Sequence, residues 1–235
     1  MARNLILTGG IRHDFEDNTE AVMDLLNQVD LVSEFTTDID GGIKLLENES
    51  FDLVTVMALR WPMEGNPKYA PLRAQYGYSM SEQSRTMLTN FVKRGGGLFG
   101  LHTACLCFDD WDGWQDILGG AWNWGHSYHP PVGLVTVTPT NNQHAITSNI
   151  GKFSLTDEVY SNLNLANDVV PLITASATPG SEEPVLWARH VEQGRVVFDA
   201  LGHNRQSLDH ETHSRLIQRC AAWASGFSDQ AITSL

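Results

Sequence analysis

The sequence predicts a single α/β domain, residues 1–235, built on a doubly wound sheet. Three observations support this class. A length of 235 residues suits one large domain. Hydrophobic residues make up 42% of the chain and charged residues 18%, which is typical of a globular protein. Short apolar runs alternate with helical patterns near the start, and this β-α-β-α-β order implies parallel strands joined by right-handed crossovers.

The first elements follow from apolar runs and helical spacing. The expected order is a strand over 5–7, a helix over 21–29, a strand over 31–35, a short helix over 43–46 and a strand over 51–57. The strands are short and apolar, as buried strands are, and the first helix repeats apolar residues on one face. Residues 62–79 are rich in Pro, Gly and Tyr and lack periodicity, which predicts a long loop over the site.

The rest of the chain combines a further parallel unit with antiparallel strands. The expected elements are a helix over 81–93, a central buried strand over 98–101, a solvent-facing strand over 132–138, strands over 184–191 and 195–201, and a final helix over 211–224. Ser81 suits the N-cap of its helix. Glu192-Gln-Gly194 is a hairpin signal between the last two strands. We therefore expect a mostly parallel sheet with added antiparallel strands.

Charge and cysteine content narrow the class of function. A formal net charge of −13 argues against nucleic acid and against an anionic membrane as partners, because both need a basic surface. Cys105, Cys107 and Cys220 are too few for a disulfide framework. The first residues lead straight into an apolar strand without a signal-peptide pattern, so we expect a cytoplasmic protein. The expected partner is a small molecule, with a homo-oligomer possible.

Large functional side chains follow several of the predicted strands. His13 follows the first strand, Trp61 the third, His102 the central strand and His203 the last long strand. Ligands of a doubly wound sheet bind beyond the carboxyl ends of its strands, so we expect these side chains to meet at one edge. His102 comes directly after Gly97-Leu-Phe-Gly-Leu101, where a sharp strand-to-helix turn would hold it at the top of the sheet.

Other polar residues are candidates with a competing structural role. His129 precedes two prolines in a rigid segment. Asp157 and Glu158 are adjacent, so on a strand they would point to opposite faces and only one could enter a shared site. Helix capping is the alternative role for Asp157. The histidines expected at the surface are His190, His210 and His213.

Familiar catalytic motifs are missing from the sequence. There is no G-x-S-x-G elbow, no Walker loop, no H-E-x-x-H and no G-x-G-x-x-G after a strand. Gly95-Gly96-Gly97 precedes a strand, so it is expected to form a turn and not a phosphate cradle. Cys105 lies three residues beyond the predicted turn, inside an expected helix, which is a poor position for a nucleophile.

Several short blocks together resemble the trehalose-utilisation (ThuA-like) family. They are Gly97-Leu-Phe-Gly-Leu-His-Thr-Ala104, His129-Pro-Pro131, Gln143-His-Ala-Ile-Thr147, Leu155-Thr-Asp-Glu-Val-Tyr160, Pro184-Val-Leu-Trp-Ala-Arg189, Gly194-Arg-Val-Val-Phe198 and Leu201-Gly-His203. Each block alone is weak, whereas their order and spacing are fairly specific. The resemblance spans residues 4 to 224, nearly the whole chain.

The resemblance implies a flavodoxin-like fold related to class I glutamine amidotransferases, and a role in sugar metabolism, often beside enzymes that oxidise sugars. In those amidotransferases a cysteine occupies the elbow and a histidine follows a late strand. This chain resembles them in the second feature, at His203, but has His102 at the elbow. Attack by a thiolate on an amide is therefore not expected, and the chain is not expected to be a glutamine amidotransferase. His126 is an imidazole additional to the family's usual pattern.

Together these features predict an enzyme that acts on a sugar or keto-sugar. His102 and His203 would be acid/base groups, because imidazole titrates near neutral pH. Glu158 or Asp157 would orient one imidazole or act as the second base. Isomerisation, hydration, elimination and hydrolysis all remain open, so the class is a carbohydrate-active isomerase, lyase or hydrolase.

The remaining candidates concern substrate and metal binding. The side chains expected to contact the sugar are His13, Trp61, Trp124, His129 and Tyr160. Aromatic rings among them would stack on the C–H surface of the sugar. Imidazoles with a carboxylate also suit a divalent metal such as zinc, for which the expected ligands are His102, His129 and His203. The alternative is a non-catalytic carbohydrate- or partner-binding domain that lost the amidotransferase nucleophile.

Overall fold

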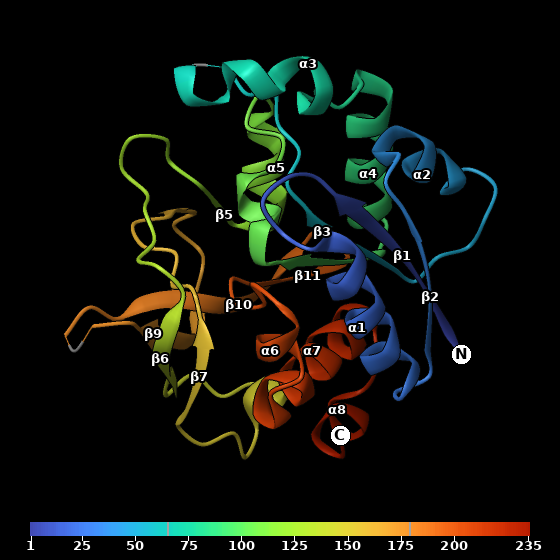
Figure 1. Cartoon of the computed structure of the whole chain (residues 1–235). Coiled ribbons are helices and arrows are strands. Elements are labelled where there is room, and N and C mark those ends of the chain that lie inside the picture. Colours follow the sequence, from blue (N-terminus) through green and yellow to red (C-terminus); the bar gives the residue numbers. More distant parts are fainter. Residues whose placement is uncertain (65, 179) are drawn as a thin grey trace.

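The computed structural model describes residues 1–64, 66–178 and 180–235, and in it a mixed nine-stranded sheet lies between two layers of helices (Figure 1). The strands are β1 (Ala2–Gly9), β2 (Leu31–Thr36), β3 (Leu53–Ala58), β4 (Gly97–Leu101), β6 (Gly133–Pro139), β7 (Phe153–Asp157), β9 (Pro171–Ser176), β10 (Glu183–Val191) and β11 (Gly194–Asp199). A separate two-stranded pairing joins β5 (Gly120–Ala121) to β8 (Asn164–Leu165).

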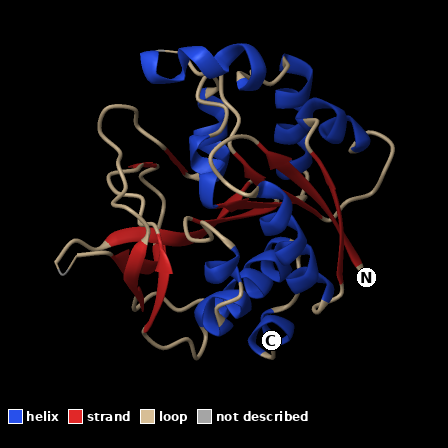
Figure 2. Ribbon diagram, in the orientation of Figure 1, coloured by secondary structure: helices blue, strands red, loops and turns tan. Residues whose placement is uncertain are grey.

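The helices follow the strands in alternation over the first part of the chain. The α-helices are α1 (Phe15–Asn27), α2 (Ile39–Leu45), α3 (Arg73–Tyr76), α4 (Glu82–Lys93), α5 (Asp112–Leu118), α6 (Arg205–Leu208), α7 (Glu211–Ala224) and α8 (Asp229–Thr233). Three short 3₁₀ helices are η1 (Pro67–Leu72), η2 (His102–Leu106) and η3 (Ala145–Thr147). In Figure 2, α1 and α7 cover one face of the sheet, and α2, α4 and α5 cover the other.

The sheet has a parallel half and an antiparallel half. Its order is β2-β1-β3-β4-β11-β10-β9-β6-β7. The pairings from β2 to β11 are parallel, and those from β11 to β7 are antiparallel. We expected a mostly parallel sheet, whereas the observed sheet has four parallel and four antiparallel pairings. Apolar and polar residues alternate less clearly in the later strands, and this hid how many of them belong to the same sheet.

The direction of β7 follows from these pairings. Four successive antiparallel steps lead from β11 through β10, β9 and β6 to β7, so β7 again runs in the direction of β11. The carboxyl end of β7 therefore lies at the same edge of the sheet as the carboxyl ends of β1, β4 and β11. Glu158, which directly follows β7, is delivered to this edge together with the residues that follow the parallel strands.

The sequence features explain most of the local structure. Strand β3 is buried at every position, as its mostly apolar sequence predicts. The Ser81 side chain accepts a hydrogen bond from the backbone N–H of Ser84, so this residue caps α4 as expected. Residues 62–79 are not a plain loop: η1 and α3 form within them, with Asn66 capping η1. Residue 65 of that stretch lies outside the described residues.

One histidine expected at the surface is buried in the core. His213 is fully buried in α7, where its Nε2 lies 3.2 Å from the Asp199 carboxylate and its Nδ1 lies 2.9 Å from the carbonyl oxygen of Ser207. The expectation was wrong because the helical position of His213 faces the end of β11, which the sequence alone does not show. His190 is exposed, as expected.

Candidate active site

Four side chains from distant parts of the chain converge beyond the carboxyl edge of the sheet. They are His13 after β1, His102 after β4, Glu158 after β7 and His203 after β11. One ligand-type atom from each lies within 4.8 Å of the others. The topology brings these residues together because each of the four strands ends at the same edge. The sequence placed three of them there and left open whether Asp157 or Glu158 would join them.

His102 occupies the turn between β4 and η2 in a left-handed backbone conformation. Its φ is 48°, a value that residues with a side chain rarely adopt. This conformation lets the chain leave the strand abruptly and places the imidazole over the edge of the sheet. The ring is 2% exposed, and its Nδ1 lies 2.7 Å from the carbonyl oxygen of Ala200. A carbonyl only accepts, so Nδ1 carries the hydrogen and Nε2 presents its lone pair to the site.

The Nε2 atom of His102 faces two neighbours. The Nε2 atom of His13 lies 3.1 Å away, and the hydroxyl of Tyr160 lies 3.0 Å away. Burial lowers the pKa of His102 to about 4, so the ring is neutral at physiological pH. Burial, with the nearby His102 and His203 rings, also lowers the pKa of His13 to about 3. The cluster thus contains two neutral imidazoles.

Glu158 connects the cluster to two further imidazoles. Its Oε1 lies 3.2 Å from Nδ1 of His129, and its Oε2 lies 3.3 Å from Nδ1 of His203 and 3.8 Å from Nε2 of His102. Burial opposes ionisation of Glu158, but the two facing histidines hold its pKa far below the usual range. Conversely, the Glu158 carboxylate raises the pKa of His129 and of His203. The carboxylate is therefore ionised and stabilises protons on its partners.

Asp157 points away from the cavity. It is fully buried, and its carboxylate accepts hydrogen bonds from the backbone N–H of Gly202 at 2.8 Å, from the backbone N–H of His203 at 3.2 Å and from the hydroxyl of Ser207. These bonds fix the segment that follows β11. Only Glu158 of the adjacent pair faces the imidazoles, in agreement with the alternation of side chains along a strand.

Aromatic side chains wall a cavity of about 350 Å³ over this cluster. Tyr69, Trp122, Trp124 and Tyr160 line it. Trp61 does not belong to the lining: it is 2% exposed, with Tyr69 packed edge-on at 5.1 Å and Trp124 stacked at 5.9 Å between ring centroids. It therefore supports the aromatic wall from behind.

Sequence reasoning missed several lining residues. Tyr69, Trp122, Arg12 and Lys68 line the cavity but were not among the candidates. The Trp-Asn-Trp spacing of Trp122 and Trp124 was a usable signal, because it repeats a large aromatic residue within a segment rich in glycine. Tyr69 lies in η1 within the stretch expected as a loop, and nothing in its local pattern marked it.

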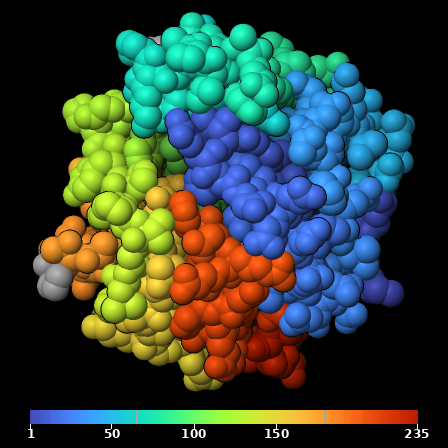
Figure 3. All heavy atoms as spheres, in the orientation of Figure 1, coloured from blue at the N-terminus to red at the C-terminus, as the bar shows by residue number. Residues whose placement is uncertain are grey.

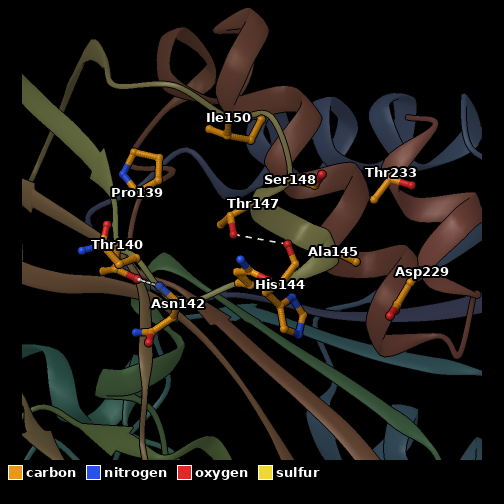
Figure 4. Close-up of a pocket in the computed structure, with 12 residues that line it drawn as sticks. Pro139, Thr140, Asn142, His144, Ala145, Thr147, Ser148, Ile150, Asp229 and Thr233 are labelled. Atoms are coloured by element: carbon orange, nitrogen blue, oxygen red, sulfur yellow. Dashed lines mark hydrogen bonds between the residues drawn. The ribbon is translucent and has the colours of Figure 1, made fainter.

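The cavity lies where segments distant in the sequence meet. Figure 3 shows the blue N-terminal segment, the teal segment that includes η1, the yellow-green segment before β6 and the orange-red segment that includes α6 side by side on one face. A larger hollow, of about 540 Å³, lies between the end of β6, η3 and α8 and is lined by polar residues such as Thr140, Asn142 and Asp229 (Figure 4). It contains one imidazole, His144, and none of the four converging side chains.

The free thiol near the turn is not arranged for nucleophilic attack. Cys105 is buried, and its Sγ lies 3.7 Å from the backbone carbonyl oxygen of His102. Burial raises its pKa well above the usual value, so the thiolate is disfavoured. The position that a strand-to-helix nucleophile would occupy belongs to His102.

The fold, with a residue in left-handed conformation directly after the central parallel strand, is that of an α/β protein and is similar to the fold of a glutamine amidotransferase. A glutamine amidotransferase from Thermotoga maritima matches 99% of this chain and 89% of its own, with a TM-score of 0.50 and 10% identity. A family model described as ThuA, trehalose utilisation, matches residues 3–224. The chain therefore belongs to the ThuA family, which connects it with sugar metabolism.

Solved structures agree with this membership in their fold. A ThuA-like protein from Parabacteroides merdae covers 96% of this chain and 90% of its own at 17% identity, with a TM-score of 0.75. A second, from Bacteroides uniformis, covers 95% of this chain and 91% of its own at 17% identity, with a TM-score of 0.66. No curated protein matches the chain. Among the described residues, no helix combines the length and apolar character needed to cross a membrane.

Proposed function

We propose that this chain is an enzyme of sugar metabolism that acts on a sugar or keto-sugar through histidine acid/base chemistry. The observation that carries the proposal is the convergence of His102, Glu158 and His203 at one edge of the sheet: Glu158 and His203 line the cavity, and His102 Nε2 lies just beneath it, 3.8 Å from Glu158 Oε2. Membership of a trehalose-utilisation family supports the sugar as substrate class.

The two kinds of imidazole suit opposite proton transfers. Neutral His102 offers a lone pair and can take a proton from a carbon or hydroxyl of the substrate. His203 and His129, whose pKa values the Glu158 carboxylate raises, can hold a proton and return it. The hydroxyl of Tyr160, 3.0 Å from His102 Nε2, can donate to a developing negative charge on oxygen. Asp157, with its hydrogen bonds to backbone, positions His203 and takes no part in proton transfer.

The cavity wall supports a sugar as the ligand. Trp122, Trp124 and Tyr69 present aromatic surface, which suits the C–H face of a pyranose ring. Arg12, Lys68 and His129 lie among these rings and can bind hydroxyl or carbonyl oxygens. A volume of about 350 Å³ lies within the range of small-molecule sites. The same geometry serves isomerisation, hydration, elimination or hydrolysis, which share a proton transfer beside an oxygen-bearing carbon.

The remaining expectations accompany this proposal. We propose one domain over residues 1–235 and a cytoplasmic location, with a homo-oligomer as a further possibility. The parallel strands β2-β1-β3-β4-β11 follow the order of flavodoxin-like sheets, which supports a common architecture with class I amidotransferases. Amide hydrolysis by a thiolate is not part of the proposal, because Cys105 is buried and burial raises the pKa of its thiol.

The experiment is a turnover screen of disaccharides, glycosides and their keto derivatives by mass spectrometry, with and without added divalent metal. The parent chain should convert one of these compounds, and His102→Gln should lower kcat by about 100-fold or more, which is the usual contribution of general acid/base catalysis. His190→Gln is the matched control, because His190 is exposed on β10.

Two results would contradict the proposal. Full turnover by His102→Gln would show that His102 is not the general base. Sugar binding without turnover of any compound by the parent chain would instead favour the non-catalytic binding domain. Binding is measured by calorimetry on the same panel, so that the two results are separated.

A further inference from the structure

We propose that His13, His102, His203 and Glu158 together bind one divalent first-row transition-metal ion, with zinc the expected occupant. This inference concerns the cavity of the proposed function and rests on it for the substrate class. It changes the roles of two residues, because an ion held by His102 Nε2 and His203 Nδ1 occupies the positions where those nitrogens would otherwise carry or accept a proton. It differs from the ligand set expected from the sequence in including His13 and Glu158 and in leaving out His129.

The first observation is the pairing of two imidazole nitrogens. His102 donates its Nδ1 hydrogen to the carbonyl oxygen of Ala200 at 2.7 Å, and Nδ1 of His13 faces the carbonyl oxygen of Ile11 at 3.4 Å. The two Nε2 atoms lie 3.1 Å apart, and the Tyr160 hydroxyl lies 3.0 Å from the same His102 nitrogen. Two ring nitrogens at this separation are spaced like neighbouring ligands of one cation, which would accept a lone pair from each.

The second observation is the spacing of the donor atoms. Zinc bonds of about 2.0–2.1 Å in a tetrahedral site place neighbouring ligand atoms about 3.3 Å apart. Here His13 Nε2 lies 3.1 Å from His102 Nε2, and Glu158 Oε2 lies 3.8 Å from His102 Nε2 and 3.3 Å from His203 Nδ1. Three edges of the coordination polyhedron are therefore nearly formed before any ion binds.

The third observation is a donor atom without a partner. Nδ1 of His203 is inaccessible to solvent and makes no hydrogen bond of acceptable geometry, although the Glu158 carboxylate lies beside it. A buried ring nitrogen usually has a partner. An ion between His203 and Glu158 supplies one, because it accepts the nitrogen lone pair and neutralises the carboxylate.

The surroundings of the cluster also match those of metal sites. Metal-bound histidines commonly donate their other ring hydrogen to a backbone carbonyl, as His102 does to Ala200. The second oxygen of the ligating carboxylate has a partner of its own: Oε1 of Glu158 lies 3.2 Å from Nδ1 of His129. His129 therefore orients the carboxylate and does not reach the ion. Imidazoles combined with one carboxylate suit zinc and its first-row neighbours better than magnesium or calcium.

The test measures metal binding directly. The full-length chain is purified, treated with a chelator and reloaded with Zn²⁺, or with Co²⁺ as a spectroscopic probe. Elemental analysis should give one ion per chain, and Co²⁺ should show the intense visible absorption of a tetrahedral site. His13→Ala and Glu158→Gln should each lose stoichiometric metal. His129→Ala should bind about 10–100-fold more weakly, as is usual for outer partners, and His190→Ala should bind like the parent chain.

Each outcome decides the question. Absence of stoichiometric metal in the parent chain, or binding unchanged in His13→Ala and Glu158→Gln, overturns the inference. Circular dichroism of each variant shows that metal loss does not reflect unfolding. If the chain binds one ion but converts no sugar, this inference stands and the proposed function fails. If the reloaded chain holds no stoichiometric ion but turns over sugar, the function stands and the metal site fails.

Discussion

The carboxylate of Asp157 accepts a hydrogen bond from the backbone N–H of Gly202 at 2.8 Å, so the end of β7 is tied to the segment that follows β11. The same carboxylate accepts from the backbone N–H of His203 at 3.2 Å. The two adjacent carboxylates therefore have different roles. Asp157 binds the backbone of the segment that contains His203, and Glu158 faces the imidazole ring of His203.

Replacing Asp157 should destabilise the protein and loosen His203. Asp157→Asn keeps the shape but removes one acceptor oxygen from a buried carboxylate that accepts four hydrogen bonds, and a hydrogen bond to a charged group contributes about 1.5–3 kcal/mol. We expect the free energy of unfolding in urea to fall by about 2 kcal/mol. Asp168→Asn is the control, because Asp168 pairs with Arg189 at the exposed surface. Equal stability of Asp157→Asn and the parent would contradict this role.

Truncating the aromatic wall should weaken sugar binding more than catalysis. Trp122→Ala and Tyr69→Ala each remove surface that lines the cavity without touching His102 Nε2. We expect KM to rise roughly tenfold, which corresponds to about 1.4 kcal/mol, while kcat changes little. Steady-state kinetics on the substrate found in the screen measures both. Phe35→Ala, on the exposed edge strand β2, should leave KM unchanged. An equal rise in KM for Phe35→Ala would show that the effect is not specific to the residues that line the cavity.

The His213–Asp199 pair should make stability depend on pH. Burial opposes the charge on His213, but the facing Asp199 carboxylate, aided by Asp157, raises its pKa above the usual 6.5. A raised pKa in the folded state means that the folded chain binds the proton more tightly than the unfolded chain. The stabilisation is therefore complete below pH 6.5 and is lost as pH rises through the folded-state pKa.

Urea unfolding of the parent chain and of His213→Asn between about pH 5.5 and pH 9 tests the direction of this pH dependence. The range covers roughly three pH units around the usual histidine pKa. The difference in unfolding free energy between the two proteins should shrink as pH rises. Using this difference removes the opposing contributions of His13 and His102, whose pKa values burial lowers. A difference that grows with pH would show that His213 is neutral in the folded state.

Cys105 should be dispensable for turnover. Cys105→Ala removes a buried thiol that contacts the turn at His102 through its backbone only. We expect kcat and KM within twofold of the parent, about 0.4 kcal/mol, and a loss of stability on the order of 1 kcal/mol, typical of a small buried truncation. Thiol alkylation of the native protein should likewise proceed slowly, because burial raises the pKa of this cysteine. Abolished turnover in a folded Cys105→Ala would restore the thiol as nucleophile.

Local physics made much of the fold predictable. The mostly apolar sequence of β3 and the cap at Ser81 are local features of the chain, and both elements form as expected. The stretch 62–79 was harder, because η1 and α3 are short and carry no repeating apolar face. The burial of His213 depends on Asp199, a partner on another element, and so it left no local pattern.

For the site, the sequence by itself determined which side chains follow the parallel strands. A residue after such a strand lies at the carboxyl edge whatever the rest of the chain does, and this places His13, His102 and His203. Their shared edge is a consequence of strand direction alone.

Only the tertiary structure decided that Glu158 joins them and Asp157 does not. Four antiparallel steps across β10, β9 and β6 set the direction of β7, and no local pattern encodes that number. The register of β7 against β6 then sets which of two adjacent carboxylates faces the imidazoles. A shift of one residue would exchange them, because side chains alternate between the faces of a sheet. The same long-range packing put Trp61 behind Trp124 instead of in the cavity.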